Sequence, residues 1–168
     1  MKPEKEINLF RLIRELNRQK IRYLIIGRRA VILYGGPVLT ADHDIWLHPE
    51  DKKKVLLLLS DALDFDLSHP PDTKIPIVTG FSGTKKYDLF FQKSVKNIKN
   101  ETIEFEDCYR NSVLKEDVRE KVSFRIPSIE DLIRLKKIRK ANVKDQQDIE
   151  YLLEAKLLSR KPKKGKES

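Results

Sequence analysis

Three aspartates stand in apolar, strand-like runs of this chain, where acidic residues are disfavoured. Asp42 and Asp44 lie in Thr-Ala-Asp-His-Asp-Ile-Trp-Leu at residues 40–47, and Asp88 lies in Lys-Lys-Tyr-Asp-Leu-Phe-Phe at residues 85–91. Residues i and i+2 of a strand share a face, so we expect the first two carboxylates side by side, about 7 Å apart along the backbone. If Asp88 belongs to a neighbouring strand, three carboxylates converge. Such a cluster needs a cation, and Mg²⁺ or Mn²⁺ held there would position a triphosphate.

A second set of residues suits phosphate binding. The apolar run at 21–26 predicts a strand that ends at Gly27, and a short helix follows over 28–34. Free N–H groups at a helix N-terminus, next to a glycine that leaves room, bind phosphate well. Arg28 and Arg29 add positive charge at the same point. Phosphate-binding and metal-binding elements are therefore one connection apart, which suits nucleoside triphosphate (NTP) chemistry.

The elements that must position these residues follow from hydrophobic periodicity and turn signals. The sequence predicts a helix at 4–19, a strand at 21–26, a helix at 28–34, a strand at 42–47, a helix at 49–63, two strands at 75–81 and 85–91 joined by a turn, a short strand at 102–105, a helical turn at 108–115, a helix that begins after Ser128, and a last helix at 143–157. This order predicts an α/β or α+β fold: a small mixed sheet, helices mainly on one face, and C-terminal helices.

Composition limits the class of protein. The 168 residues suit one domain, predicted over 1–158, with a basic, disordered tail at 159–168. A single cysteine, Cys108, is compatible with a reducing cytosol and is expected to be structural. No apolar run approaches the roughly 20 residues of a membrane span, so we expect a cytoplasmic protein without membrane contact.

The net charge of +9 favours anionic partners, and residues 131–168 hold 12 Lys/Arg against 6 Asp/Glu. This basic C-terminal region is either a solubilising tail or an arm that contacts nucleic acid.

Residues 23–47 resemble the core of the nucleotidyltransferase superfamily that includes DNA polymerase beta. They resemble in particular the small nucleotidyltransferases related to the AbiEii toxin and to the lincosamide and aminoglycoside nucleotidyltransferases. The shared pattern is an apolar strand that ends in glycine, a short helix with a glycine near its end, and Thr-x-Asp-x-Asp at 40–44 before an apolar run. Tyr87-Asp88-Leu89 resembles the family's third carboxylate strand, and 127–136 with 144–148 are similar to its C-terminal helices. The resemblance covers most of residues 7–155.

The resemblance implies a role for each acid. Asp42 and Asp44 would bind the Mg²⁺ ions that hold the triphosphate. Asp88 would complete the second metal site and help to deprotonate an attacking hydroxyl. The implied reaction transfers a nucleoside monophosphate from an NTP such as ATP to a hydroxyl acceptor and releases pyrophosphate. The acceptor stays open between a small molecule, an RNA and a protein.

The same resemblance assigns the phosphate contacts. Gly27 would lie against the β- and γ-phosphates, and Thr40 would orient the carboxylate strand. Lys136 would either reach the triphosphate across the cleft or be a solvated surface lysine. Arg28 departs from the family, which usually has Gly or Ser after the first glycine. Its guanidinium either blocks the phosphates, which gives a degenerate enzyme, or binds them bidentately.

Other residues of these motifs have structural interpretations. Asp145 and Asp148 are expected to be helix-stabilising or salt-bridged. His43 points to the opposite sheet face from its neighbours and is expected to pack, and Trp46 is either a core residue or part of the cleft lining. The competing function is a non-catalytic module that keeps the fold and binds RNA or protein. Arg28 and the basic C-terminal region favour this alternative. Membership of a toxin–antitoxin pair is a further hypothesis.

Overall fold

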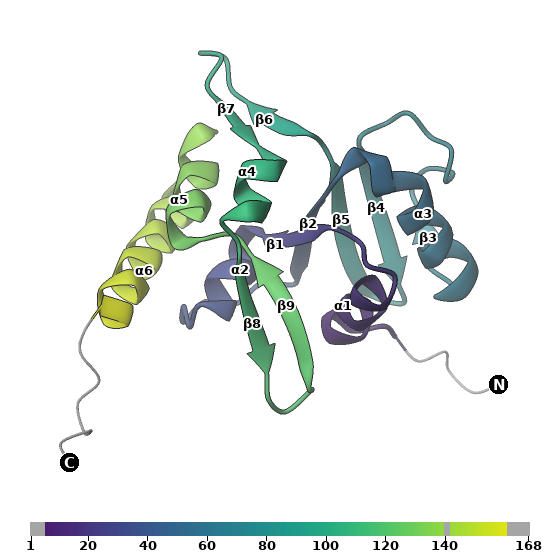
Figure 1. Ribbon diagram of the computed structural model, residues 1–168, viewed down its shortest axis with the longest axis horizontal. Helices are drawn as coiled ribbons and strands as arrows, with labels where there is room; N and C mark the ends of the chain where they lie inside the picture. Colours follow the sequence, from purple (N-terminus) through teal and green to yellow (C-terminus); the bar gives the residue numbers. More distant parts are fainter. Residues whose placement is uncertain (1–5, 140–141, 161–168) are drawn as a thin grey trace.

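A five-stranded mixed sheet forms the centre of the protein. A computed structural model describes residues 6–139 and 142–160 (Figure 1). The strand order is β1-β2-β5-β4-β3, where β2 and β5 are parallel and the other neighbours are antiparallel. The strands are β1 (Tyr23–Ile26), β2 (Asp42–Leu47), β3 (Asp66–Leu67), β4 (Ile77–Ser82) and β5 (Lys85–Phe91).

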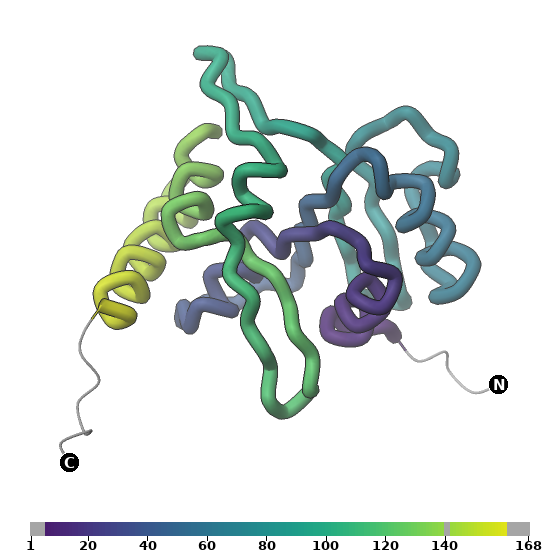
Figure 2. Tube along the Cα trace, viewed as in Figure 1, coloured from purple at the N-terminus to yellow at the C-terminus, as the bar shows by residue number. Residues whose placement is uncertain are grey.

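Six helices and two hairpin-like ribbons surround this sheet. The helices are α1 (Leu9–Arg18), α2 (Gly27–Leu33), α3 (Lys52–Leu57), α4 (Phe105–Arg110), α5 (Ile129–Ile138) and α6 (Val143–Arg160). A 3₁₀ turn (Pro49–Asp51) precedes α3, and a π turn (Leu58–Ala62) follows it. The ribbons pair β6 (Ser94–Lys96) with β7 (Thr102–Glu104), and β8 (Val113–Asp117) with β9 (Val122–Ile126). They project from opposite ends of the molecule (Figure 2).

The two faces of the sheet carry separate apolar clusters. The larger cluster packs α1, α2 and α3 against one face, with Leu12, Ile13 and Leu16 of α1 fully buried at helical spacing. Each such side chain contributes about 1.5–3 kcal/mol by leaving water. The smaller cluster lies on the opposite face, where Leu24 and Trp46 meet α4. The predicted fold class, a mixed sheet with helices mainly on one face and C-terminal helices, is confirmed.

Several predicted boundaries were wrong for local reasons. The first helix begins at Leu9 because Asn8 caps it: its Oδ1 accepts the Arg11 amide at 2.9 Å. The helical turn expected at 108–115 is instead α4, which ends at Arg110, followed by β8. α6 continues to Arg160, two residues into the predicted tail, and residues 161–168 lie outside the described part of the chain.

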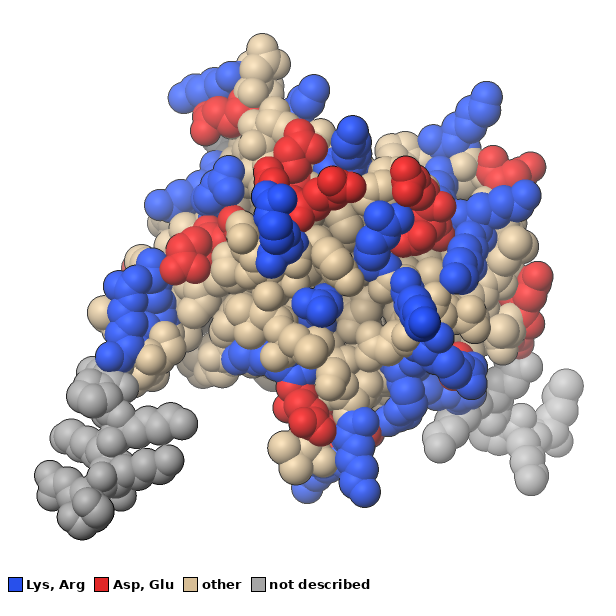
Figure 3. All heavy atoms as spheres, viewed as in Figure 1, with Lys and Arg blue, Asp and Glu red and all other residues tan. Residues whose placement is uncertain are grey.

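The surface is strongly charged, and its charges are mixed. On the face shown in Figure 3, lysine and arginine side chains alternate with acidic ones and do not form a single basic patch. Within the described residues, no helix is long and apolar enough to cross a bilayer.

Candidate active site

The three aspartates lie on one face of the sheet. Asp44 of β2 and Asp88 of β5 are Cα partners in the parallel pair, and Asp42 precedes Asp44 by two residues on the same strand. Partners on neighbouring strands point to the same face, so the register sets Asp44 beside Asp88. His43, between the two acids, points to the core face, is 7% exposed and stacks on Tyr87 with ring centroids 4.8 Å apart. The packing interpretation of His43 is confirmed.

Asp88 is engaged by its own neighbours in the sheet. Thr79 Oγ1 donates to Asp88 Oδ1 at 2.8 Å, and Lys86 Nζ lies 3.6 Å from Asp88 Oδ2. Among residues 6–139 and 142–160, no group of three or more His, Cys, Asp or Glu side chains is gathered closely enough to hold a metal ion. Metal binding by Asp42, Asp44 and Asp88 therefore stays a prediction.

Asp44 is the electrostatic centre of this face. Burial and, after it, the negative charges of Asp88 and Asp42 together raise the pKa of Asp44 to about 6. The charges of Asp88 and Asp42 thus disfavour the ionised form of Asp44, and a divalent cation would relieve that repulsion. The donor chemistry at this point fits Mg²⁺ or Mn²⁺, which prefer carboxylate oxygens.

Gly27 lets the Asp44 carboxylate lie directly against the β1–α2 turn. Its φ of +68° is a left-handed conformation that favours glycine, and a Cβ there would lie 2.6 Å from Asp44 Oδ2. No side chain caps the start of α2, which begins at this glycine. The Asp44 carboxylate therefore takes the place that a side chain at residue 27 would occupy.

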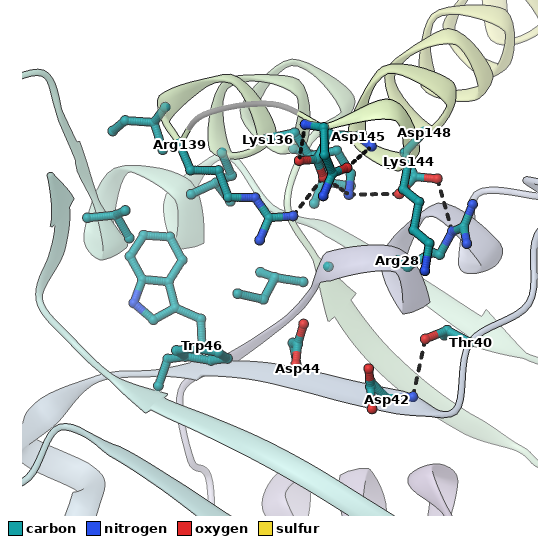
Figure 4. A pocket seen from close by; sticks show the side chains of 18 of the residues that line it. Arg28, Thr40, Asp42, Asp44, Trp46, Lys136, Arg139, Lys144, Asp145 and Asp148 are labelled. Atoms are coloured by element: carbon teal, nitrogen blue, oxygen red, sulfur yellow. Dashed lines mark hydrogen bonds and ion pairs between the residues drawn. The ribbon is translucent and has the colours of Figure 1, made fainter. Parts of the chain in front are cut away.

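A cavity of about 630 Å³ opens in front of Asp42 and Asp44. One wall consists of the β1–α2 turn and β2, and the other consists of α5, α6 and the flanking residues Arg139 and Asn142 (Figure 4). Its size suits a small-molecule ligand such as a nucleotide. The end beyond Asp44 is apolar and is lined by Trp46, Phe90, Val95, Leu135 and Ile138.

The second wall is built on a row of buried charges. Lys136 Nζ lies 3.0 Å from Asp148 Oδ2 and 3.9 Å from Asp145 Oδ1, and all three side chains are at most 5% exposed. Lys136 is thus not a solvated surface lysine, and that alternative was wrong. Asp145 and Asp148 are salt-bridged, as expected. Burial would raise the pKa of Asp145, but hydrogen bonds from Arg139 and from the Asn142 amide outweigh it and hold the pKa below its usual value.

Two arginines extend this row toward the cavity. Arg28 Nε donates to Asp148 Oδ1 at 3.2 Å, and Arg139 donates to Asp145 Oδ1 at 2.7 Å. Figure 4 shows both arginines on the side of the cavity opposite Asp44, anchored to α6. Arg139 stays 64% exposed, and its charge lowers the pKa of Asp44, so it faces the acids across the cavity.

Arg29 and Thr40 have different surroundings. Arg29 does not line the cavity, because its guanidinium donates to the Thr40 carbonyl at 2.9 Å and lies near His43 and Tyr87 on the core face. Thr40 lines the cavity, and its hydroxyl accepts the Asp42 amide at 3.2 Å, which fixes the start of β2. The structure thus brings Gly27, Arg28, Thr40 and Lys136 to the cavity and leaves Arg29 out of it.

Sequence reasoning missed Arg139 and Lys144, which both line the cavity. Their only signal was their place in the basic segment after residue 131, which also contains many surface lysines. Trp46 combines its two expected roles: it is 1% exposed, donates from Nε1 to the Gln92 carbonyl at 2.7 Å, and lines the cavity with one side.

Solved structures share this architecture. The lincomycin-bound lincosamide antibiotic adenylyltransferase LnuA matches with a TM-score of 0.65 at 14% identity, over 90% of this chain and 99% of that chain. An antigenic nucleotidyltransferase-like protein from Paracoccidioides brasiliensis matches at 0.56 and 19%, over 88% and 72%. The antibiotic-resistance factor ANT(2'')-Ia matches at 0.55 and 13%, over 86% and 80%. At these identities the likeness shows the fold alone.

Sequence comparison identifies the family. No curated protein shows a significant match to this chain. A sequence profile of the family described as "Nucleotidyltransferase of unknown function (DUF6036)" matches residues 5–159. The acids in register, the glycine turn and the helical second wall lie within those residues, and the chain belongs to this nucleotidyltransferase family.

Proposed function

We propose that the protein transfers a nucleoside monophosphate from an NTP to an acceptor hydroxyl and releases pyrophosphate, with a divalent metal as cofactor. The observation that carries this proposal is one cavity with Asp42 and Asp44 on one wall, Lys136 and Arg139 on the other, and Arg28 reaching from the β1–α2 turn to Asp148 of the second wall. A triphosphate with its metal needs both kinds of wall: carboxylates for the metal and cations for phosphate oxygens.

Each wall has a defined task. Asp42 and Asp44 would hold Mg²⁺ or Mn²⁺, and the metal would neutralise part of the negative charge of the triphosphate. Gly27 would let phosphate oxygens approach the β1–α2 backbone, because it has no side chain, and it lets the Asp44 carboxylate lie directly against that turn. Asp88, oriented by Thr79, would take the proton of the attacking hydroxyl.

Arg28 would bind the triphosphate and would not block it. Its Nε is held by Asp148 of α6, so the guanidinium is directed across the cavity and away from the Gly27 backbone. Arg139 would also bind the triphosphate, while its ion pair with Asp145 holds its guanidinium in place. The apolar end of the cavity, with Trp46 and Phe90, would hold the nucleobase by stacking and apolar contact.

Trp46 gives a direct test, because it is the only tryptophan and it lines the cavity. ATP, GTP, CTP and UTP are titrated in Mg²⁺ while tryptophan fluorescence is followed, with calorimetry as a second readout. Asp44→Ala should abolish the metal-dependent part of binding and lower pyrophosphate release by about 10²-fold or more. Asp61→Ala, which removes an exposed acid far from the cavity lining, is the control. NTP binding that is unchanged in Asp44→Ala would refute the metal role.

A non-catalytic binding module is the second candidate. Arg28 at a position where the family usually has a small residue is the observation that favours it. In that case NTP or nucleic acid would bind equally well with EDTA and in Asp44→Ala, and no pyrophosphate would form with any acceptor.

A further inference from the structure

The last helix, α6, carries apolar side chains on two faces. On its inner face, Asp145, Asp148 and Leu152 are buried where α6 packs against α5 and α2. On its outer face, Leu153 is 47% exposed and Leu157 is 62% exposed. These two leucines are four residues apart, so they lie one above the other on the same side of the helix. Within the part of the chain that the structure describes, only the inner face is packed.

A charged residue flanks each of these leucines on the outer face. Glu150 precedes Leu153 by three residues, Arg160 follows Leu157 by three, and both charged residues are exposed. Spacings of three, four and three residues are those of the a and d positions of a coiled coil, which share one side of a helix. We call Glu150, Leu153, Leu157 and Arg160 the α6 stripe. None of the four lines the cavity, and α6 lies at the outer edge of the molecule (Figure 1).

The charges of the stripe are not used inside one chain. Lys156 Nζ lies 2.9 Å from Glu130 Oε1, which leaves Arg160 without an ion pair of its own among residues 6–139 and 142–160. Glu150 has no ion pair with those residues either, and it lies four positions before Glu154. Like charges at this spacing repel one another in an isolated helix. An oppositely charged partner beside Glu150 would relieve that repulsion.

The order of the stripe selects its partner. From the N-terminal to the C-terminal end it consists of an acid, a leucine, a leucine and a base. A matching surface must present a base, two apolar groups and an acid in that direction. The same stripe on a second copy of the chain does so when the two helices run antiparallel, and such a self-complementary contact suits a two-fold dimer.

A parallel pair of the same helices would not match. It would place Glu150 beside Glu150 and Arg160 beside Arg160, and like charges that face one another across an interface weaken it. It would also bring together two copies of segment 160–168, each with five Lys/Arg against one acid. The antiparallel pair separates these basic segments.

We propose that two copies of this chain form a dimer through their α6 stripes, antiparallel about a two-fold axis midway between Leu153 and Leu157. Leu153 of each copy packs on Leu157 of the other, and Glu150 of each copy forms an ion pair with Arg160 of the other. Because Asp145 and Asp148 lie on the inner face of the same helix, the second walls of the two cavities are then joined back to back. The dimer does not depend on the proposed function, since the stripe lies outside the cavity.

Sedimentation velocity and equilibrium of the full chain over a range of concentrations test the leucines. The unaltered protein should show a monomer–dimer equilibrium. Leu157→Ala should raise the dimer dissociation constant about 10-fold or more, because the two-fold axis removes the contact twice. Leu158→Ala is the matched control: Leu158 is also 62% exposed, but it points about 100° further around the helix. This control should leave the dissociation constant unchanged.

Charge reversal tests the orientation of the helices. Glu150→Lys and Arg160→Glu each place like charges opposite one another in the antiparallel pair, so each should weaken the dimer about 10-fold at low salt. The double variant restores one acid and one base at every contact and should dimerise again. A mixture of the two single variants in equal amounts should also associate, for the same reason. Lys53→Glu, at an exposed lysine of α3, is the control and should have no effect.

These rescues separate the loss of a contact from the loss of the fold, and urea unfolding of each variant checks the fold directly. A protein that stays monomeric at every concentration would overturn the inference. A dimer that Leu157→Ala and the single charge reversals leave intact would place the interface elsewhere and overturn it as well. The same holds if Leu158→Ala weakens the dimer as much as Leu157→Ala does, or if the double charge reversal fails to restore it.

Discussion

Replacement of Gly27 by alanine should inactivate the site while it leaves the fold intact. The added Cβ would lie 2.6 Å from Asp44 Oδ2 and 3.3 Å from its Cγ. Ordinary contact needs about 3.5 Å, so the Asp44 carboxylate must turn away by close to 1 Å. A misplacement of that size in a reacting site costs about 10²-fold in rate.

Gly35→Ala separates this effect from backbone strain. Gly35 also has positive φ, at +93°, but nothing lies within 4 Å of its added Cβ. Both variants should lose about 1–2 kcal/mol of stability, because alanine is strained at positive φ. Only Gly27→Ala should then lose metal-dependent NTP binding and turnover.

The assay compares three proteins: the unaltered chain, Gly27→Ala and Gly35→Ala. Urea unfolding gives the free energy of unfolding, and Trp46 fluorescence with pyrophosphate release gives binding and rate. If Gly27→Ala binds and turns over NTP as well as Gly35→Ala does, the close approach of Asp44 to Gly27 has no function and the reasoning fails.

Three further outcomes follow from the charges and the burial. Asp148→Asn should cost about 3–5 kcal/mol in urea unfolding, because it strips a buried Lys136 of its nearest partner; Asp107→Asn, at an exposed ion pair, should cost under about 1 kcal/mol, and equal losses would contradict this. Without metal, the folded pKa of Asp44 lies above its unfolded value, so Asp44 favours folding at low pH and loses that contribution as pH rises through about 6. Asp44→Asn should therefore gain stability relative to the unaltered chain between pH 4 and 7, and a constant difference across that range would contradict it. Burial, followed by the charge of Asp131, raises the pKa of the Cys108 thiol to about 12, so thiol reagents should modify it only after unfolding, and fast modification of the native protein would count against this.

The carboxylate strands were predictable because their signal is local. Alternation and chain composition set β2 and β5 at 42–47 and 85–91, and the structure has both with the same bounds. The same holds for the start of α5, where Ser128 Oγ accepts the Asp131 amide at 3.1 Å. Acids that a strand places at i and i+2 share a face in any fold that contains the strand.

The second wall was not predictable in the same way, because it depends on partners distant in sequence. Whether the Arg28 guanidinium would block the phosphates or bind them depends on Asp148, which lies 120 residues further along the chain. The β8–β9 ribbon was missed for a similar reason. Val113–Asp117 carries three charged residues, and only pairing with β9, in particular Val113 with Ile126, makes it a strand. The local sequence of residues 113–117 carries no information about its pairing with β9, so propensity alone could not predict this strand.

The ion pairs that join α5, α6 and Arg28 also determine at which point of its synthesis the protein can form the proposed site. Asp42, Asp44 and Asp88 leave the ribosome long before Asp148 does, since synthesis runs from the N-terminus. Until α6 has docked, Arg28 and Lys136 lack their partner Asp148. A nascent chain, or a fragment cut before α6, thus carries the acids without Asp145 and Asp148, so the proposed nucleotide chemistry would be confined to chains that include α6.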